Sequence, residues 1–315
     1  MYSPKPLFEE RMKKLLDGEK DYNNFMNTIR TPSRNIIRCN TLKISPEELK
    51  EKLEKNGWKI SQPYTKYKEI IVIESNLTPG ALGNSQEHIN GEYYVQELCS
   101  MMSAIALNPK EHEIIIDLCA SPGSKTTQMC SYMKNKGTII ANDCNEERVH
   151  ILNQNLSRCQ CMNVIVTIND AVQLCKRLEK SNAKFDKILL DAPCSGEGIL
   201  RSDDKLFLSW SMGTIKKLSG IQKKMISAAI PLLEKNSFLV YSTCTHDPEE
   251  NEEVIDFALK NFNVEIEKID LPIKTREGIT SWEDKKYDER IKLCHRIYPQ
   301  DNDSEGFFVA KIRKL

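Results

Sequence analysis

The first thirty residues contain apolar positions that recur at helical spacing. These positions are Leu7, Phe8, Met12, Leu15 and Leu16. Residues three and four apart lie on one face of a helix, so this spacing predicts one or two amphipathic helices at the start of the chain.

The segment from residue 36 to residue 75 predicts a small α+β unit. Two apolar runs, "IIRCNTLKIS" and "EIIVIES", are typical of strands, and "SPEELKEKLEKNGW" between them is typical of a helix. Ser45 is suited to the N-cap, Pro46 to the first helical position, and Glu48 to a capping box that closes back on Ser45. Gly57 stands just past the expected end of this helix, where glycine is favoured.

The rest of the chain alternates strand-like and helix-like segments. Its nearly continuous apolar runs lie at residues 113–120, 137–144, 163–170, 186–193, 237–244, 264–271 and 306–312. Apolar strands that alternate with helices are typical of an α/β fold, with a largely parallel sheet covered on both faces. A connector punctuated by Gly, Pro and Asn occupies residues 76–91. We therefore expect an N-terminal subdomain at 1–91 and a larger α/β domain at 92–315.

Polar residues end several of the expected strands. In sheets of this kind, ligands bind beyond the carboxyl ends of the strands. The residues found there are Asp117, Asp143, Asp170, Asp191, Cys194 and Cys244. We expect these side chains to gather along one rim of the sheet. The alternative for each aspartate is a structural one, in which it caps the helix that follows.

Composition and charge narrow the class of protein. The chain has 315 residues, enough for about two domains, and 45 basic residues balance 45 acidic ones. Residues 1–75 hold 15 Lys and Arg against 11 Asp and Glu, which weakly favours a polyanion-facing surface over ordinary solvated faces. The eleven cysteines are scattered as reduced thiols would be. No stretch has the apolar length of a signal peptide or a membrane span, so we expect a cytoplasmic protein.

The segment "DLCASPGSKTTQ" combines a strand end, a tight turn and a helix start. Its turn holds Pro122 and a single glycine, Gly123, unlike the GxGxxG pattern that cradles pyrophosphate. S-adenosylmethionine is an alternative ligand that carries no phosphate and needs backbone contacts and carboxylates. Asp143, about 20 residues past the turn, is suited to ribose hydroxyls, and Asp170 is suited to an adenine amine.

Two strand-like runs lead directly into cysteines. "ILLDAPCSGEG" contains Cys194 and "LVYSTCT" contains Cys244. Most cysteines are buried among apolar neighbours, but Pro, Ser, Thr and Gly surround these two. Because the thiolate is the reactive form, a cysteine held rigidly at a strand end and facing a pocket is suited to covalent chemistry.

These motifs resemble those of the Nol/Nop/Sun family of RNA 5-methylcytosine methyltransferases. The similarity covers about residues 92–315, where the family's order is followed by "YYVQELCSMMSA", "DLCASPGSKTTQ", "IIANDCNEERV", "ILLDAPCSGEG", "LVYSTCT" with "PEENEEVI", and "HRIYPQ" with "GFFVAKI". "IRCNTLKISPEELKEKLEKNGW" also resembles the family's N-terminal segment. The sequence departs from many relatives at Ser121 and Ser124, where they have the similarly small alanine and glycine.

The resemblance implies a Rossmann-like, S-adenosylmethionine-dependent methyltransferase sheet with a small N-terminal α+β subdomain that binds RNA. It also implies roles for individual residues. Cys244 is the expected nucleophile toward carbon 6 of cytosine, Cys194 is expected to help release the product, and Asp191 to hydrogen-bond or protonate the ring nitrogen. The expected cofactor contacts are Cys119, Ala120, Ser121, Pro122, Gly123, Ser124, Lys125, Asp143, Arg148, Asp170 and Asp191. For Arg148 and Lys125, a helix-surface charge and a first-turn cation are the structural alternatives.

The expected substrate is transfer RNA, with ribosomal RNA as the alternative. A DNA cytosine methyltransferase would instead use Cys194 as its nucleophile, and a non-catalytic RNA-binding assembly factor would need neither thiol. Arg38, Lys43 and Arg296 are candidate phosphate contacts, with solvated surface as the alternative for each.

No metal is expected. Cys159 and Cys161 form a CxC pair, but no matching pair of ligands accompanies it in the sequence.

Overall fold

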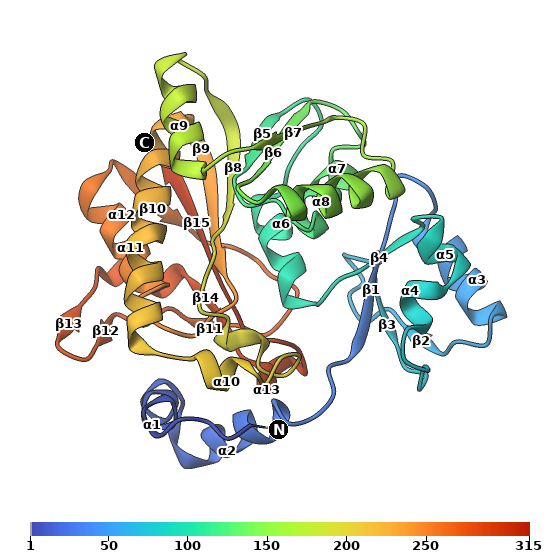
Figure 1. Ribbon diagram of the computed structural model, residues 1–315, viewed down its shortest axis with the longest axis horizontal. Coiled ribbons are helices and arrows are strands. Elements are labelled where there is room, and N and C mark those ends of the chain that lie inside the picture. Colours follow the sequence, from blue (N-terminus) through green and yellow to red (C-terminus); the bar gives the residue numbers. More distant parts are fainter. Residues whose placement is uncertain (1) are drawn as a thin grey trace.

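The computed structural model describes residues 2–315, with a small N-terminal sheet beside a nine-stranded sheet (Figure 1). The small sheet has the order β2-β3-β1-β4, and its neighbouring strands are antiparallel. Its strands are β1 (Asn35–Cys39), β2 (Ile60–Ser61), β3 (Ile70–Ile73) and β4 (Tyr93–Val95). The small sheet therefore takes its last strand from beyond the 76–91 connector. The division of the chain into 1–91 and 92–315 stays a prediction.

Helix α3 (Pro46–Lys55) covers the small sheet and begins at the predicted capping box. The Glu48 N–H donates to Ser45 Oγ at 3.2 Å, and the Ser45 N–H donates to Glu48 Oε2 at 3.0 Å. Leu49 and Leu53 on its inner face are buried with Ile37 of β1. The predicted helix and the two strands that flank it are confirmed. Two short helices, α4 (Ala81–Asn84) and α5 (Gln86–Ile89), precede β4.

Helices α1 (Pro6–Leu15) and α2 (Gly18–Thr28) confirm the amphipathic pattern at the start of the chain. Their apolar face does not pack on the small sheet. Phe8 lies edge-on to Phe207 with ring centroids 5.3 Å apart, and Phe25 belongs to the same buried cluster as Trp210 and Tyr298. The first helices are therefore anchored to the larger body of the molecule, as the lower part of Figure 1 shows.

The nine-stranded sheet has the order β11-β14-β15-β9-β8-β5-β6-β7, and β10 also pairs with β15. Its parallel strands are β5 (Ile114–Asp117), β6 (Thr138–Asp143), β7 (Val164–Ile168), β8 (Phe185–Asp191) and β9 (Leu233–Thr243). Its antiparallel strands are β10 (Val264–Glu267), β11 (Arg276–Glu277), β14 (His295–Ile297) and β15 (Phe307–Lys314). The last two predicted strands, β10 and β15, are thus present but form antiparallel pairs. The connection from β14 to β15 is too short for the helical crossover that parallel strands need.

Helices cover both faces of this sheet, as predicted. They are α6 (Met102–Leu107), α7 (Ser124–Tyr132) and α8 (Glu146–Arg158) on one face, and α9 (Ala171–Lys180), α11 (Met212–Ala229) and α12 (Glu252–Asn261) on the other. Neighbouring strand residues point to opposite faces, so Leu189 packs toward α6 and α7 while Leu190 packs toward α11 and α12.

Short elements complete the described chain. They are helices α10 (Leu206–Ser209) and α13 (Pro299–Asn302), the hairpin of β12 (Ser281–Trp282) and β13 (Lys285–Lys286), and 3-10 turns at Cys99–Met101, Glu197–Ile199, Ile230–Leu232 and Glu289–Leu293.

Candidate active site

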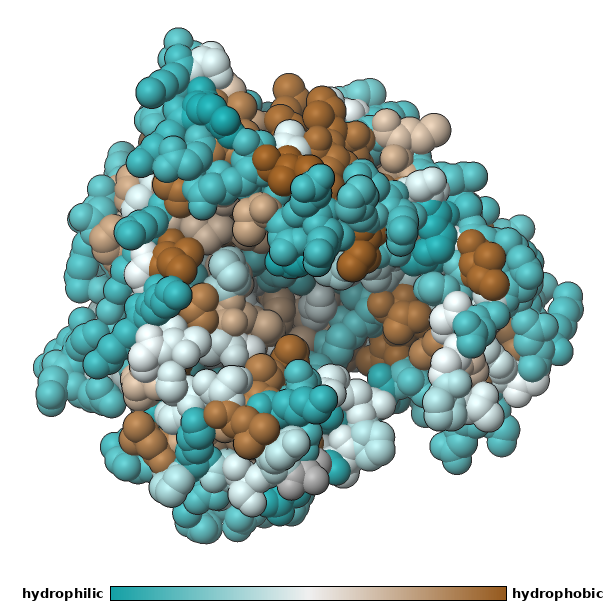
Figure 2. All heavy atoms as spheres, in the orientation of Figure 1, coloured by the Kyte–Doolittle hydropathy of each residue, from teal (hydrophilic) through white to brown (hydrophobic). Residues whose placement is uncertain are grey.

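A cavity of about 390 Å³ opens at the carboxyl ends of the parallel strands. Figure 2 shows a hollow in this part of the molecule, between α11 and the α7–α8 pair. The lining residues are Leu118, Cys119, Ser121, Asn142, Asp143, Cys144, Arg148, Asn169, Asp170, Ala171, Val172, Asp191, Ala192, Pro193, Cys194, Ile221, Met225 and Cys244. Five of the six polar residues expected along the rim are among them.

Asp117 is the exception. It is 1% exposed, and its Oδ2 accepts a hydrogen bond from the Thr126 hydroxyl at 2.7 Å. Its side chain turns inward beneath α7 instead of toward the cavity. Burial raises the pKa of Asp117 to about 7, so this carboxyl belongs to the interior of the fold.

The two motif cysteines meet across neighbouring strands. Strands β8 and β9 are parallel with Asp191 opposite Ser242, so the loops that follow them leave the sheet at the same edge. Cys194 Sγ and Cys244 Sγ lie 3.0 Å apart, and the Cys244 N–H donates to Cys194 Sγ at 3.2 Å. Both cysteines are free and partly exposed. Their convergence on one cavity agrees with the expectation drawn from the motifs.

A close backbone contact holds the two cysteine loops together. The Gly198 N–H donates to the Cys244 carbonyl at 2.9 Å, and the Gly306 N–H donates to the Gly198 carbonyl at 2.8 Å. A Cβ on Gly198 would lie 2.2 Å from the Gly306 carbonyl oxygen. Only glycine fits at this position of "DAPCSGEG" without moving the loop.

Asp191 stands beside the thiols and is held at both oxygens. Its Oδ1 accepts the Ser242 hydroxyl at 2.7 Å, and its Oδ2 forms an ion pair with Lys125 Nζ at 2.8 Å. The Lys125 amine also donates to Ser100 Oγ at 3.0 Å. These bonds fix the orientation of the Asp191 carboxyl group beside the two thiols.

Electrostatic effects favour the protonated forms of both Cys194 and Lys125. The pKa of Cys194 lies well above its ordinary value because Cys194 shares a hydrogen bond with Cys244 and the surrounding protein desolvates its sulfur. Cys194 is therefore held as a thiol that can donate to Cys244. Burial alone would lower the pKa of Lys125, but the charge and the hydrogen bond of Asp191, together with the nearby Cys244 and Asp117, raise this pKa, so the amine stays charged.

The other half of the cavity is suited to a nucleoside. Asp143 Oδ2 accepts the Ser121 N–H at 3.3 Å and lies 3.4 Å from Arg148 Nη2. Asp170 is an N-cap, accepting the Gln173 N–H at 2.9 Å, and it also lines the cavity. The structural and functional interpretations of Asp170 are therefore compatible.

These residues fit S-adenosylmethionine. Carboxylates at the ends of β6 and β7 match its ribose hydroxyls and adenine amine, and the apolar side chains of Val172, Ile221 and Met225 supply a surface for the adenine ring.

Not every expected cofactor contact reaches this cavity. Cys119, Ser121, Asp143, Arg148, Asp170 and Asp191 line it. The remaining members of the turn, Ala120, Pro122, Gly123, Ser124 and Lys125, are outside the lining set. Lys125 instead points at Asp191, and Gly123 has φ +104° at the start of α7, a conformation that favours glycine.

Two of the three candidate phosphate contacts are wrong. Arg38 is 1% exposed and donates to the Ser124 carbonyl at 2.7 Å and to Thr127 Oγ1 at 2.8 Å. Arg296 is 2% exposed and forms a two-pronged ion pair with Glu252, with Nη2 to Oε2 at 2.6 Å. Both guanidinium groups bind inside the protein and are out of reach of a phosphate. Lys43 is partly exposed, and its amine donates to the Asn90 carbonyl.

The sequence interpretation missed two polar contacts at the thiols. Ser242, in "YSTCT", donates to Asp191, and the hydroxyls of Ser195 and Thr245 lie 2.7 Å apart immediately after the two cysteines. The available signal was the hydroxyl next to each cysteine, although only strand pairing shows that the hydroxyls meet.

Residues 2–315 contain neither a candidate membrane span nor a candidate metal site. No helix there combines the length and apolar character needed to cross a bilayer. No group of three or more His, Cys, Asp or Glu side chains in that range is placed to hold a metal ion.

The family models match almost the whole chain. The model described as 16S rRNA methyltransferase RsmB/F matches residues 104–313, and the model for the N-terminal domain of 16S rRNA methyltransferase RsmF matches residues 5–98.

Two curated relatives align along nearly all of this chain. The tRNA (cytosine(49)-C(5))-methyltransferase of Pyrococcus abyssi is 42% identical over 305 residues, which cover 97% of this chain and 94% of the relative. The ribosomal RNA small subunit methyltransferase F of Psychromonas ingrahamii is 38% identical over 312 residues, which cover 98% of this chain and 62% of the relative. The chain thus spans about three fifths of the length of the second relative.

Solved structures agree with the sequence comparison. A methyltransferase homolog protein from Pyrococcus horikoshii is 35% identical, with a TM-score of 0.85 over 100% of this chain and 96% of that chain. The structure of NSun6 from Pyrococcus horikoshii with SFG is 27% identical, with a TM-score of 0.82 over 98% of each chain.

Proposed function

The chain belongs to the RsmB/F family of S-adenosylmethionine-dependent RNA cytosine-5 methyltransferases, and we propose that it methylates a cytosine of transfer RNA through a covalent adduct on Cys244. The observation that carries the adduct is the pair of free thiols 3.0 Å apart, beside Asp191 in one cavity. A fold retained only to bind RNA would have no need for this arrangement.

Cys244 supplies the nucleophile in this proposal. Carbon 5 of cytosine is too weak a nucleophile to attack a methyl group directly. Addition of the Cys244 thiolate to carbon 6 pushes electrons toward carbon 5, which can then form the new carbon–carbon bond. Cys194, held as a thiol, can donate a hydrogen bond to the Cys244 sulfur during this attack.

Asp191 and Cys194 serve the later steps. Lys125 and Ser242 orient the Asp191 carboxyl group, so that it can share a proton with, or deliver one to, the ring nitrogen on which negative charge develops as the adduct forms. After methylation a water molecule takes the carbon 5 proton, and the electron pair of that C–H bond restores the ring double bond and expels Cys244 as a thiolate. Cys194 lies within contact of Cys244 and is suited to assist this elimination.

S-adenosylmethionine supplies an activated methyl group on sulfur when it is bound. We assign its ribose hydroxyls to Asp143, its adenine amine to Asp170, and its positioning near the thiols to Cys119, Ser121, Arg148 and Asp191. The rest of the turn, including Gly123 with its left-handed backbone, shapes the start of α7 beneath this site.

Transfer RNA is the proposed substrate because the tRNA relative from Pyrococcus abyssi is 42% identical and the match extends over 94% of it. Ribosomal RNA is the second candidate, since the family model and the relative from Psychromonas ingrahamii carry that description.

The substrate test uses purified protein, S-adenosylmethionine with a labelled methyl group, and equal amounts of unmodified tRNA and 16S rRNA. Labelled 5-methylcytosine in tRNA alone supports the proposal, and label in rRNA alone favours the second candidate. Cys244→Ala should abolish the label. A DNA-type scheme, with Cys194 as nucleophile, predicts that Cys244→Ala remains active and that Cys194→Ala does not.

The RNA-contacting surface is proposed to include the exposed sides of α9 and α11. These two helices carry seven basic residues, Lys176, Arg177, Lys180, Lys216, Lys217, Lys223 and Lys224, against one acidic residue, Glu179, in a chain with no net charge. Both helices line the cavity, through Val172 and Ile221. Positive charge beside the cavity suits a phosphate backbone. Residues 1–91 are proposed as a second RNA-contacting unit. The protein is proposed to act on its RNA in the cytoplasm.

A further inference from the structure

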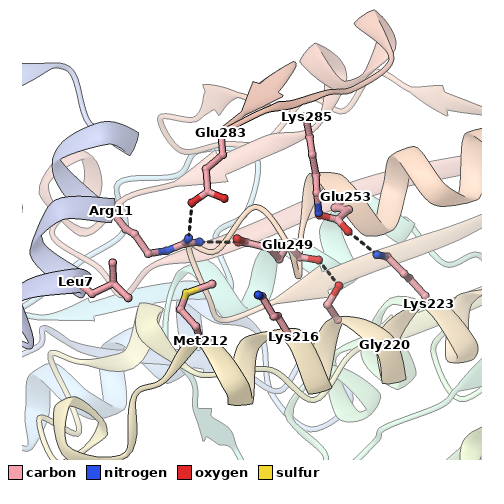
Figure 3. A pocket seen from close by; sticks show the side chains of 11 residues that line it. Leu7, Arg11, Met212, Lys216, Gly220, Lys223, Glu249, Glu253, Glu283 and Lys285 are labelled. Atoms are coloured by element: carbon pink, nitrogen blue, oxygen red, sulfur yellow. Dashed lines mark hydrogen bonds and ion pairs between the residues drawn. The ribbon is translucent and has the colours of Figure 1, made fainter.

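Arg11 extends from helix α1 into the protein interior, close to the segment that follows Cys244. Arg11 is 4% exposed, and its Nη2 donates to Asp247 Oδ1 at 2.9 Å and to Glu249 Oε2 at 2.6 Å. Figure 3 shows Arg11 reaching from α1 toward Glu249 and Glu283, in a pocket that α11 also lines. The N-terminal helix is therefore tied by charge to the segment that follows Cys244.

Asp247 connects this guanidinium to both cysteine loops. Its Oδ2 accepts hydrogen bonds from Ser195 Oγ at 3.4 Å and from Thr245 Oγ1 at 3.5 Å, and these two hydroxyls lie 2.7 Å apart. Ser195 directly follows Cys194, and Thr245 directly follows Cys244. Any displacement of Asp247 is therefore passed to the neighbours of both thiols.

Arg11 also balances a buried group of acids. Asp247, Glu197 and Glu249 are each less than 10% exposed. Burial raises the pKa of Asp247, and burial together with Asp247 raises the pKa of Glu197 well above its ordinary value. Removing the guanidinium leaves Asp247 without its cationic partner, so the loop after Cys244 must rearrange to find another.

We propose that Arg11 is a positioning residue for methyl transfer, which acts through Asp247, Ser195 and Thr245 to hold the thiols of Cys194 and Cys244 in contact. The inference rests on the proposed function, because it assigns Arg11 to that same reaction. It gives Arg11 of α1 a supporting role in the reaction, whereas a buried side chain at this position makes no direct contact with RNA.

Arg11→Ala, Arg11→Lys and the control Lys14→Met test this. Lys14 lies on α1 with its side chain 55% exposed, paired only with Glu10 in the described chain. Misplacement by about 1 Å costs about 100-fold in rate, so we expect Arg11→Ala to lower kcat about 100-fold with KM for RNA changed less than about twofold. Arg11→Lys keeps the positive charge but loses the planar group of several N–H donors, so its kcat should lie between that of Arg11→Ala and that of the wild type. Added guanidinium ion should restore part of the kcat of Arg11→Ala, and Lys14→Met should match the wild type in kcat.

A second readout does not depend on methylation. A bifunctional alkylating reagent just long enough to join touching thiols is added, and the bridged Cys194–Cys244 peptide pair is quantified by mass spectrometry. The yield should fall several-fold in Arg11→Ala and in Arg11→Lys, and stay unchanged in Lys14→Met. If Arg11→Ala does not fold, Arg11→Lys carries both measurements.

The outcomes separate the two proposals. Unchanged kcat with a raised KM for RNA, or unchanged bridging in the Arg11 variants, overturns the positioning role. A wild-type protein that bridges its thiols but methylates no RNA overturns the proposed function, and the bridging yield still decides the role of Arg11.

Discussion

Gly198→Ala tests how tightly catalysis depends on the contact between the two cysteine loops. The new Cβ would lie 2.2 Å from the Gly306 carbonyl oxygen and 2.9 Å from the Cys244 carbonyl oxygen, whereas real Cβ contacts essentially never fall under 3.0 Å. The loop must therefore move by about 0.8 Å away from the Gly306 carbonyl oxygen, which displaces the Gly198 backbone that donates to the Cys244 carbonyl. Overpacking of this kind costs about 1–3 kcal/mol of stability, and a shift near 1 Å at a reacting pair costs about 100-fold in rate.

The assay combines steady-state methylation of RNA with urea unfolding. We expect kcat to fall about 100-fold in Gly198→Ala, with KM for S-adenosylmethionine nearly unchanged because Asp143 ends β6 and Asp170 caps α9, outside the loops that Gly198 joins. Gly220→Ala is the matched control, since its Cβ meets nothing within 4 Å and helical alanine is favoured by about 0.5–1 kcal/mol. A Gly198→Ala protein with wild-type kcat would refute the reasoning.

Three further predictions concern other parts of the molecule. Ser45→Ala removes the capping box of α3 and should lower the free energy of unfolding by about 1 kcal/mol, measured by urea denaturation, with no loss of kcat. Burial raises the pKa of Asp117 from 3.8 to about 7, so its contribution to stability is complete below about pH 4 and is lost as the pH rises through about 7. Asp117→Asn should therefore make the free energy of unfolding fall less between these pH values, and an unchanged pH profile would contradict this. Among residues 2–315, no carboxylate lies within ion-pair distance of Lys217 or Lys224. Replacing both with alanine should weaken RNA binding and flatten the plot of log affinity against log salt by about 0.7–0.9 per lost phosphate contact, whereas Lys134→Ala, paired with Glu111, should leave the slope unchanged.

Features that depend on residues close together in the sequence were predictable. The capping box at Ser45 and Glu48 depends on residues three positions apart, and the parallel strands follow from continuous apolar runs. The meeting of Cys194 and Cys244 followed from placing two strand ends on one rim, which requires only that β8 and β9 belong to the same parallel sheet.

Features that depend on distant contacts were not predictable. Arg38 and Arg296 look like surface charges in sequence, and only the packing of β1 on α7 and of β14 on the loop after Cys244 buries them. The attachment of α1 to Trp210 and Asp247 spans about 200 residues or more along the chain. Likewise, the pairing of Lys125 with Asp191 joins the start of α7 to the end of β8.

The most direct test of the account is to trap the adduct. Cys194→Ala protein is incubated with RNA and S-adenosylmethionine, and the slow-migrating protein–RNA band on a denaturing gel is digested and mapped by mass spectrometry. The account predicts a methylated cytosine joined to Cys244, because elimination is slowed when the neighbouring thiol is lost. A nucleotide joined to any residue other than Cys244 would contradict it. So would the same band from the double variant that carries both Cys194→Ala and Cys244→Ala.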